Sequence, residues 1–172
     1  CDCLASLLPE IPNSNIHVAV VDNDSRDDSV KQIESWIIKN STDQVHLISS
    51  EYNGGFAFGN NLGISYKNAN NYLLLNSDTV VRKGAIEVLL ETIKANVSAG
   101  VVSPRLEWLD GKPQLSCFNM HTPVSEFLSA AKTGLFSRIL NNYVVAKPLE
   151  ESLSYSDWTS FACVLIRREV FE

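Results

Sequence analysis

Short apolar runs alternate with amphipathic stretches along the first hundred residues of the chain. Each apolar run spans four to six residues and ends in polar residues, as strands do, whereas the amphipathic stretches repeat apolar side chains every three or four residues, as helices do. This alternation predicts an α/β fold with a doubly wound, mostly parallel sheet. The predicted strands are residues 16–21, 45–48 and 72–75, and the predicted helices are residues 29–39, about 60–68 and 83–96.

The second half of the chain has a less regular pattern. Asp110-Gly111 lies between apolar runs and predicts a hairpin or tight turn. A helix is predicted from Val124 to Leu140 and an apolar strand from Trp158 to Ile166, after which Arg167-Arg168-Glu169 opens a helix or turn. No internal repeat or low-complexity tract is present, so one domain is the simplest organisation.

Composition excludes several classes of protein. The 172 residues are 45% hydrophobic, enough for one domain with a core, and the net charge of -6 argues against a nucleic-acid-binding surface. No apolar run approaches the roughly 18 to 20 residues of a membrane span and no signal-peptide pattern opens the chain, so we expect a soluble domain. The four cysteines lack zinc-ligand spacing, which favours reduced thiols used as small apolar residues.

Polar clusters follow all three predicted strands. In a parallel sheet the carboxyl ends of the strands meet at one edge, where ligands bind, so we expect the clusters to share a pocket. Asp22 ends the first strand in VVDNDS. Its carboxylate is compatible with two roles: a turn former or helix cap, and an acceptor of hydrogen bonds from the base or sugar of a nucleotide.

The second cluster, Asn53 to Gly63 (NGGFAFGNNLG), combines four glycines with three asparagines. Glycines let backbone approach a ligand closely, and side-chain amides offer hydrogen-bond donors. The spacing matches neither the G-x-G-x-x-G dinucleotide fingerprint nor a phosphate-binding P-loop. A flexible loop is the alternative, but two phenylalanines and a helix start directly after it favour a binding segment.

The third cluster, Asn76-Ser77-Asp78, places a carboxylate at the end of an apolar strand. Asp78 lies too far ahead of the helix predicted near residue 83 to cap it well. Mg²⁺ or Mn²⁺ takes one or two carboxylates and completes its shell with water and phosphate oxygens, and such an ion would neutralise a diphosphate leaving group. Asn76 and Asp78, two residues apart, are predicted to face this pocket together.

Trp158-Thr159-Ser160 opens the last predicted strand. These residues are candidates for lining a second pocket, although Trp158 is equally compatible with a core position. The three histidines are scattered along the chain, and nothing in their spacing assigns them a role.

Five motifs resemble, in the same order, those of family 2 glycosyltransferases of the GT-A fold, closest to rhamnosyltransferase-like members that build bacterial surface polysaccharides. VVDNDSRDDS resembles the family's VVDNxSxDgS, EYNGGFAFGNNLGI its ENxGFAxGNNxGI, and LLLNSDT its LLLNPDT. GVVSPRLEWLDGKPQLS is similar to the segment after the family's metal site, and DWTSFACVLIRREVFE to W-x-S-G-A-x-x-L-I-R-R-x-x-F. The resemblance covers nearly the whole chain.

This resemblance implies one partial catalytic domain over residues 1–172, with the donor-binding part at about 1–100 and the acceptor-side part at about 101–172. It implies an inverting transfer of sugar from a nucleotide-diphosphate sugar, dTDP-rhamnose or a UDP-sugar, with Mg²⁺ or Mn²⁺ as cofactor. The acceptor would be the hydroxyl of a saccharide or lipid-linked saccharide in bacterial surface polysaccharide or cell-wall synthesis.

The family's site residues carry over by motif position. Asp78 would hold the metal as the last residue of a degenerate D-x-D motif in which Asn76 replaces the first Asp. Trp158 and Ser160 would lie on the acceptor side. The implied nucleotide and donor-binding residues are Asp22, Asn23, Asn53, Gly55, Asn60 and Asn76.

The chain departs from the family pattern in several places. Ser77 stands where proline is usual, and Phe161 replaces a glycine, which narrows or reshapes the expected acceptor pocket. The family's first strand would lie before Cys1 and its acidic general-base motif beyond Glu172, so we expect a piece of a longer protein that does not catalyse transfer alone. The full-length protein is expected in the cytoplasm, with peripheral association at the inner face of the cell membrane as one option.

Two other functions stay open. A sugar nucleotidyltransferase shares the α/β sheet but would carry a glycine-rich loop with Arg or Lys near its first strand, and none is visible in the sequence. A non-catalytic pseudo-glycosyltransferase or binding module is the other alternative, since Phe161 and a general base outside the chain are what loss of activity would look like.

Overall fold

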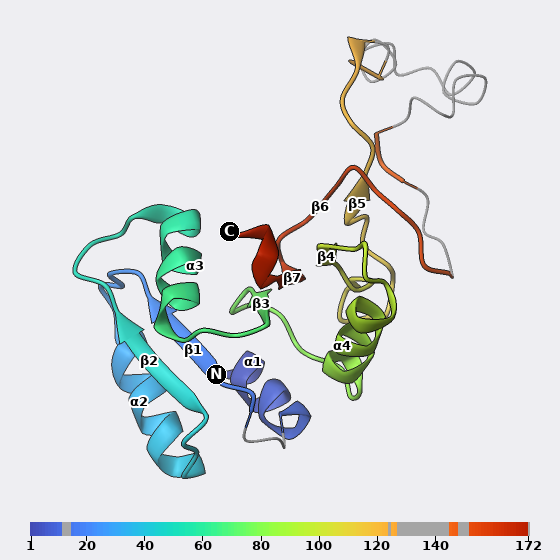
Figure 1. The fold of residues 1–172 in the computed structure, drawn as a ribbon. Helices are drawn as coiled ribbons and strands as arrows, with labels where there is room; N and C mark the ends of the chain where they lie inside the picture. The colour runs from blue at the N-terminus through green and yellow to red at the C-terminus, as the bar shows by residue number, and fades with distance from the viewer. Residues whose placement is uncertain (12–14, 124, 127–144, 148–151, 172) are drawn as a thin grey trace. The chain divides into compact units, whose positions relative to one another are not determined.

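The structure is a computed structural model that describes residues 1–11, 15–123, 125–126, 145–147 and 152–171. They belong to two compact units (Figure 1). Unit 1 comprises Cys1–Val102 and Val164–Glu172, and unit 2 comprises Ser103–Cys163. All three strand-end clusters predicted from the sequence lie in unit 1, so the fold of this unit positions the candidate site.

A parallel strand pair with two helices forms one part of unit 1. Its elements are β1 (Val18–Asp22), α2 (Ser29–Asn40), β2 (Val45–Ser49) and α3 (Gly55–Tyr66). β1 and β2 are parallel, and Asp22 lies opposite Ser49 in their register. α2 contacts β2, α3 contacts β1, and both helices lie beside the strand pair in Figure 1. The carboxyl ends of the two strands therefore meet at one edge.

A short helix precedes β1 and contributes to the core. Helix α1 (Asp2–Leu7) continues into the 3₁₀ turn η1 (Leu8–Glu10). Buried Leu7 and Ile11 pack against Ile86 and against partly buried residues of β1 and β3. This apolar cluster ties the start of the chain to the rest of unit 1.

A second, three-stranded sheet completes unit 1. Its elements are β3 (Asn71–Leu75), α4 (Ala85–Ala95), β4 (Val101–Val102), β7 (Cys163–Arg167) and the 3₁₀ turn η3 (Arg168–Val170). The strand order is β3-β7-β4, and β7 runs antiparallel to β4. β7 is the most buried strand, with Val164 fully enclosed.

Arg167 fastens the end of helix α4 to β7. Its guanidinium donates hydrogen bonds to the carbonyls of Ile93, Asn96 and Ala99. Carbonyls at a helix C-terminus have no partner within the helix, and a cationic donor also suits the negative end of the helix dipole. This contact joins two segments about 70 residues apart in the sequence.

Unit 2 has little regular structure among its described residues. Strands β5 (Cys117–Phe118) and β6 (Trp158–Thr159) pair antiparallel. A tight turn brings Glu107 opposite Pro113 in an antiparallel bridge, and Gly111 has a φ of +83°, which glycine adopts without strain. The turn predicted at Asp110-Gly111 is confirmed.

Most sequence-based elements of unit 1 are confirmed to within a few residues, and two predictions are wrong. α3 begins at Gly55 rather than near residue 60, so most of the glycine-rich segment predicted as a loop is helical. The strand predicted from Trp158 to Ile166 is divided into β6 and β7 by residues 160–162. The helix predicted from Val124 to Leu140 falls almost entirely outside the described residues.

The α/β class is confirmed, although the described strands form three small sheets. A single doubly wound sheet stays a prediction. None of the helices in the described ranges is long and apolar enough to cross a membrane, since the longest, α2 and α3, have 12 residues each.

Candidate functional site

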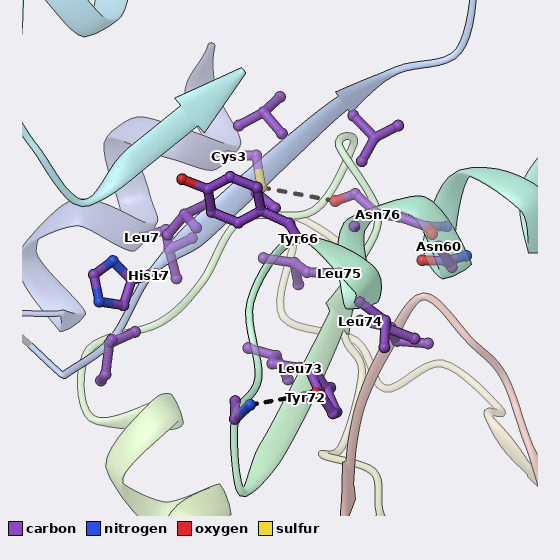
Figure 2. Close-up of a pocket in the computed structure, with 18 of the residues that line it drawn as sticks. Cys3, Leu7, His17, Asn60, Tyr66, Tyr72, Leu73, Leu74, Leu75 and Asn76 are labelled. Carbon is purple, nitrogen blue, oxygen red and sulfur yellow. Dashed lines mark hydrogen bonds between the residues drawn. The ribbon is translucent and has the colours of Figure 1, made fainter. Parts of the chain in front are cut away.

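Five of the predicted site residues line one cavity of about 1110 Å³ in unit 1. They are Asn23, Gly55, Asn60, Asn76 and Asp78. All five follow the carboxyl end of β1, β2 or β3 in the sequence, as expected for a ligand site at a strand edge. Figure 2 shows Asn60 and Asn76 together at one end of this pocket, away from His17. We call this end the polar mouth.

Asp22 and Asn53 do not line the cavity; each forms hydrogen bonds that hold neighbouring residues in place. Asp22 is 7% exposed, and its Oδ2 accepts a hydrogen bond from the backbone N–H of Ser25 at 3.2 Å. Of the two roles predicted for Asp22, the structure therefore shows the turn former. The hydrogen bond tightens the turn after β1 and holds the neighbouring Asn23 at the edge of the cavity.

Asn23 clasps the start of α3. Its Nδ2 donates to Asn53 Oδ1 at 3.1 Å and to the Gly55 carbonyl at 3.0 Å, while its Oδ1 accepts from the Gly54 N–H at 3.2 Å. Asn53 Oδ1 also accepts the Gly55 N–H at 3.0 Å. The three Asn23 bonds join the segment after β1 to the segment after β2, and the fourth bond orders residues 53–55 locally, so both asparagines position the mouth of the cavity.

The glycines of α3 serve helix packing as much as access to a ligand. A Cβ on Gly63 would lie 3.3 Å from Val21 of β1, and one on Gly59 would lie 3.7 Å from Asn23. At Gly63 the helix therefore packs closely on β1 because this position lacks a side chain, whereas Gly59 has room for a Cβ at ordinary contact distance. Gly55, with a φ of +81°, allows the sharp turn from the loop into the helix and itself lines the cavity.

A turn after β3 presents Asp78 at the mouth. The Asn76 carbonyl accepts hydrogen bonds from Thr79 through its N–H at 3.2 Å and its Oγ1 at 2.7 Å. This turn leaves Ser77 and Asp78 exposed. Within the described part of the chain, the Asp78 carboxylate has no hydrogen-bond or ion-pair partner, so it is free to bind a cation.

The donor atoms at the mouth suit Mg²⁺ or Mn²⁺. Asp78 supplies a carboxylate and Asn76 an amide oxygen, both hard ligands, and such ions fill their remaining positions with water and substrate phosphates. Clusters of three or more His, Cys, Asp or Glu are absent from the described residues, so a preformed all-protein cage is not present there. The residues present fit an ion that arrives with a phosphate ligand.

Positive side chains are scarce at the cavity. Lys67 is the one Lys or Arg among the lining residues. Its Nζ lies 2.7 Å from His17 Nε2, and His17 directly precedes β1, at the opposite end of this strand from Asn23. A diphosphate at the polar mouth would therefore meet no Lys or Arg among these residues.

Cys3 lies next to the Asn76–Asp78 turn. Its Sγ is 3.7 Å from the Asn76 carbonyl and 3.9 Å from Thr79 Oγ1. Burial raises the pKa of the Cys3 thiol, and the Asp78 charge acts in the same direction with a smaller effect. Cys3 is thus a neutral packing residue behind the turn, in agreement with the expected reduced thiols.

Trp158 and Ser160 lie in unit 2. The Trp158 ring stacks on Phe118 at 4.1 Å, and its Nε1 donates to the Asn119 carbonyl at 3.2 Å, yet Trp158 is 42% exposed. The core alternative for Trp158 is therefore wrong. Ser160 is held by its N–H, which donates to the Ser116 carbonyl at 2.8 Å.

The first ten residues were missed by the sequence-based predictions. Cys3 and Ser6 of α1 support the turn after β3, since Ser6 Oγ accepts the Val81 N–H at 2.9 Å. Leu4, Leu7 and Ile11 recur at intervals of three and four residues, which is the helical signal that identifies this segment.

An α/β unit with polar strand ends around one cavity places a candidate ligand site at the carboxyl ends of its strands. The family model for glycosyl transferase family 2 matches residues 1–116. Because this match covers more than half of the chain, the chain belongs to glycosyltransferase family 2. Membership implies the GT-A nucleotide-sugar transferase fold.

One curated relative is the low-salt glycan biosynthesis hexosyltransferase Agl10 of Haloferax volcanii. It is 30% identical over 157 residues, covering 89% of this chain and 45% of that protein. The chain thus spans less than half the length of this relative. No solved structure matches the chain significantly.

Proposed function

We propose that unit 1 binds the nucleotide diphosphate of a sugar donor and that the full-length protein transfers the sugar to an acceptor hydroxyl in glycan synthesis. One observation carries the proposal: five strand-end residues converge on one cavity in a chain that belongs to glycosyltransferase family 2. The printed name of the Haloferax relative, a glycan biosynthesis hexosyltransferase, supports hexosyl transfer as the reaction.

Some of these residues would contact the sugar donor, and the others hold the contacting residues in position. Asp22 does not line the cavity; one of its carboxylate oxygens accepts the Ser25 N–H, and contact of the other with the base or ribose of a nucleotide stays a prediction. Asn60 and Gly55 border the donor from α3. Asn23 and Asn53 hold this border in place, since their side-chain amides are engaged with each other and with the start of α3.

Asp78, with Asn76 beside it, would hold Mg²⁺ or Mn²⁺ at the mouth. When bound, the ion would neutralise the charge that develops on the diphosphate leaving group. The support is electrostatic: Lys and Arg are scarce around the cavity, and an unscreened diphosphate next to Asp78 would be repelled.

The finer features follow the family. We propose a single doubly wound sheet in the full-length protein, inversion at the sugar carbon, and a dTDP-rhamnose or UDP-sugar donor. Trp158 and Ser160 would contact a saccharide or lipid-linked acceptor, and the general base would lie outside residues 1–172. The protein would work in the cytoplasm at the inner face of the membrane.

Calorimetry on the full-length protein tests the donor site. UDP- and dTDP-sugars should bind in the presence of Mn²⁺, and Asp78→Ala should weaken binding by at least about 10-fold, since loss even of a residue that only orients a metal ligand costs about 10- to 100-fold. Asp43→Ala is the control, because Asp43 is an exposed carboxylate that does not line the cavity.

Each outcome separates the parts of the proposal. If wild type binds none of these nucleotides, the donor site is wrong. If Asp78→Ala binds as tightly as wild type with Mn²⁺ present, only the metal assignment fails. Donor binding without transfer to any saccharide would favour the non-catalytic alternative.

A further inference from the structure

An exposed phenylalanine lies beside the residues of the polar mouth. Phe56 is the second residue of α3, lines the cavity and is 56% exposed. It directly follows Gly55, whose carbonyl accepts a hydrogen bond from Asn23 Nδ2 at 3.0 Å. The hydrogen bonds of Asn23 therefore fix the backbone that carries the Phe56 ring at the edge of the site.

The other aromatic residues of this segment have a role in the fold. The Phe58 ring packs against Tyr52, with the ring centroids 4.8 Å apart, and it covers Gly54 so closely that a Cβ there would clash with it. Neither Phe58 nor Tyr52 lines the cavity. In contrast, no ring pair among the described residues includes Phe56. The segment thus uses Phe58 for packing and leaves the Phe56 ring available to a ligand.

Helix α3 places an amide on the same face as the Phe56 ring. Asn60 is four residues further along and also lines the cavity, where Figure 2 shows it. Its Nδ2 donates to the Phe56 carbonyl at 3.0 Å, and because only the amide nitrogen can donate, this bond fixes which way the amide faces. Within the described part of the chain, Asn60 Oδ1 accepts no hydrogen bond, so it is available to an N–H group of a ligand.

A nucleobase suits this surface better than a lipid or an apolar side chain does. Asn60, Asn76 and Asp78 line the same cavity as Phe56, and an apolar occupant would cover their polar atoms without giving them a partner. A nucleobase has a flat π face for an aromatic ring and polar atoms at its edge for neighbouring amides. An aromatic ring among a few placed polar groups is also the usual lining of a small-molecule site.

The position of Phe56 also fits the length of a nucleotide. A nucleoside diphosphate carries its phosphates and its base at opposite ends, so the two groups need separate contacts. Asp78, which follows β3, is the proposed site of the metal-bound diphosphate. Phe56, which follows β2, offers an aromatic ring at a different strand end of the same cavity.

We propose that Phe56 is the ring on which the nucleobase of the sugar donor stacks. This inference rests on the proposed donor site and adds to it the contact that holds the base. Every nucleobase has a π face, so stacking on Phe56 supplies affinity for the nucleotide without selecting among bases.

Calorimetry on the full-length protein with Mn²⁺ and either UDP or dTDP measures this stack without the sugar. Phe56→Ala should weaken binding by about 5- to 100-fold, the range for loss of one base stacked on an aromatic ring. Phe56→Tyr should bind as the wild type does, because a tyrosine ring also stacks. Tyr52→Ala is the matched control and should keep the wild-type affinity, since Tyr52 is 57% exposed but does not line the cavity.

The outcomes separate this inference from the proposed function. If the wild type binds neither nucleotide, the donor site fails and the stack fails with it. If the wild type binds and Phe56→Ala binds as tightly, the stack alone is wrong and the donor site stands. A loss in Phe56→Tyr or Tyr52→Ala as large as that in Phe56→Ala would also overturn the stack, because it would trace the effect to a disturbed α3.

Nuclear Overhauser contacts locate the base directly. In the complex of the full-length wild type with Mg²⁺ and the same nucleotide, the ring protons of Phe56 should show contacts to H6 of the pyrimidine. Contacts of H6 to another ring of the cavity, such as Tyr66 or Tyr72, with none to Phe56 would overturn the proposal.

Discussion

Units 1 and 2 are held together by different interactions. Every buried hydrophobic residue in the described part of the chain belongs to unit 1 except Cys163, which begins β7. Unit 2 has instead buried serines, the Phe118–Trp158 ring stack and backbone bonds such as that from the Ser160 N–H to the Ser116 carbonyl. The strand-end residues of unit 1 are therefore held in place by an apolar core, whereas unit 2 is held together by local polar and aromatic contacts.

The largest expected effect is a cavity in the core of unit 1. Ile93 of α4 is 1% exposed, so Ile93→Ala should lower the free energy of unfolding by about 2 to 5 kcal/mol. Val88→Ala, on the same helix but 60% exposed, should change it by less than about 0.5 kcal/mol. Urea unfolding measures both variants. Equal effects would contradict an apolar core centred on α4.

In unit 2, loss of the ring stack should have a smaller and local effect. Trp158→Ala removes the contact with Phe118 and the bond to the Asn119 carbonyl, at a cost of about 2 kcal/mol. Trp108→Ala is the matched control, because Trp108 is 61% exposed. Hydrogen exchange should rise around β5 and β6 in Trp158→Ala and stay unchanged in unit 1. Exchange that rises equally in both units would refute separate stabilisation.

Asn23→Ala tests the clasp at the edge of unit 1. It removes three hydrogen bonds to residues 53–55, all exposed, so we expect a loss of about 1 kcal/mol. Exchange of the Gly54 and Gly55 amides should become faster. Asn61→Ala, an exposed position of α3, is the control. Unchanged amide exchange in Asn23→Ala would mean that the clasp does not order the mouth.

The smallest expected effect concerns Cys3. Because burial raises its folded-state pKa, the neutral thiol is favoured by folding. Its contribution to stability is full below the unfolded pKa, about 8.5, and is lost as pH rises through the folded value. Iodoacetamide should therefore alkylate Cys3 more slowly than exposed Cys1 at pH 8 to 9. Equal rates, measured by mass spectrometry, would show that packing against the turn after β3 does not shield the thiol.

Periodicity predicts the strands and the amphipathic helices of unit 1 because burial there follows a regular face. Ile86, Leu89 and Ile93 recur at helical intervals and are the buried residues of α4. Periodicity does not predict the start of α3 at Gly55, since glycine is a poor helix former. Close packing of Gly63 on β1 favours glycine at that position, and only the three-dimensional contact reveals it.

The candidate site is partly visible in the sequence. Polar residues at three strand ends predict a shared edge, and the cavity brings Asn23, Asn60 and Asp78 together. The division between residues that line the cavity and residues that support it is not visible in the sequence, because Asp22 and Asn53 are distinguished only by their place in the folded structure. In unit 2 the described strands β5 and β6 have two residues each, too few to give a periodic signal.

The central claim is that the polar mouth, and not the opposite end of the cavity, holds a metal-bound diphosphate. Paramagnetic broadening in the full-length protein tests it most directly. With Mn²⁺ and a UDP- or dTDP-sugar, the amide signals of Gly55, Asn76 and Asp78 should disappear, while those of His17 and Lys67 persist. Broadening at His17 and Lys67 with intact signals at Asn76 and Asp78 would contradict the claim.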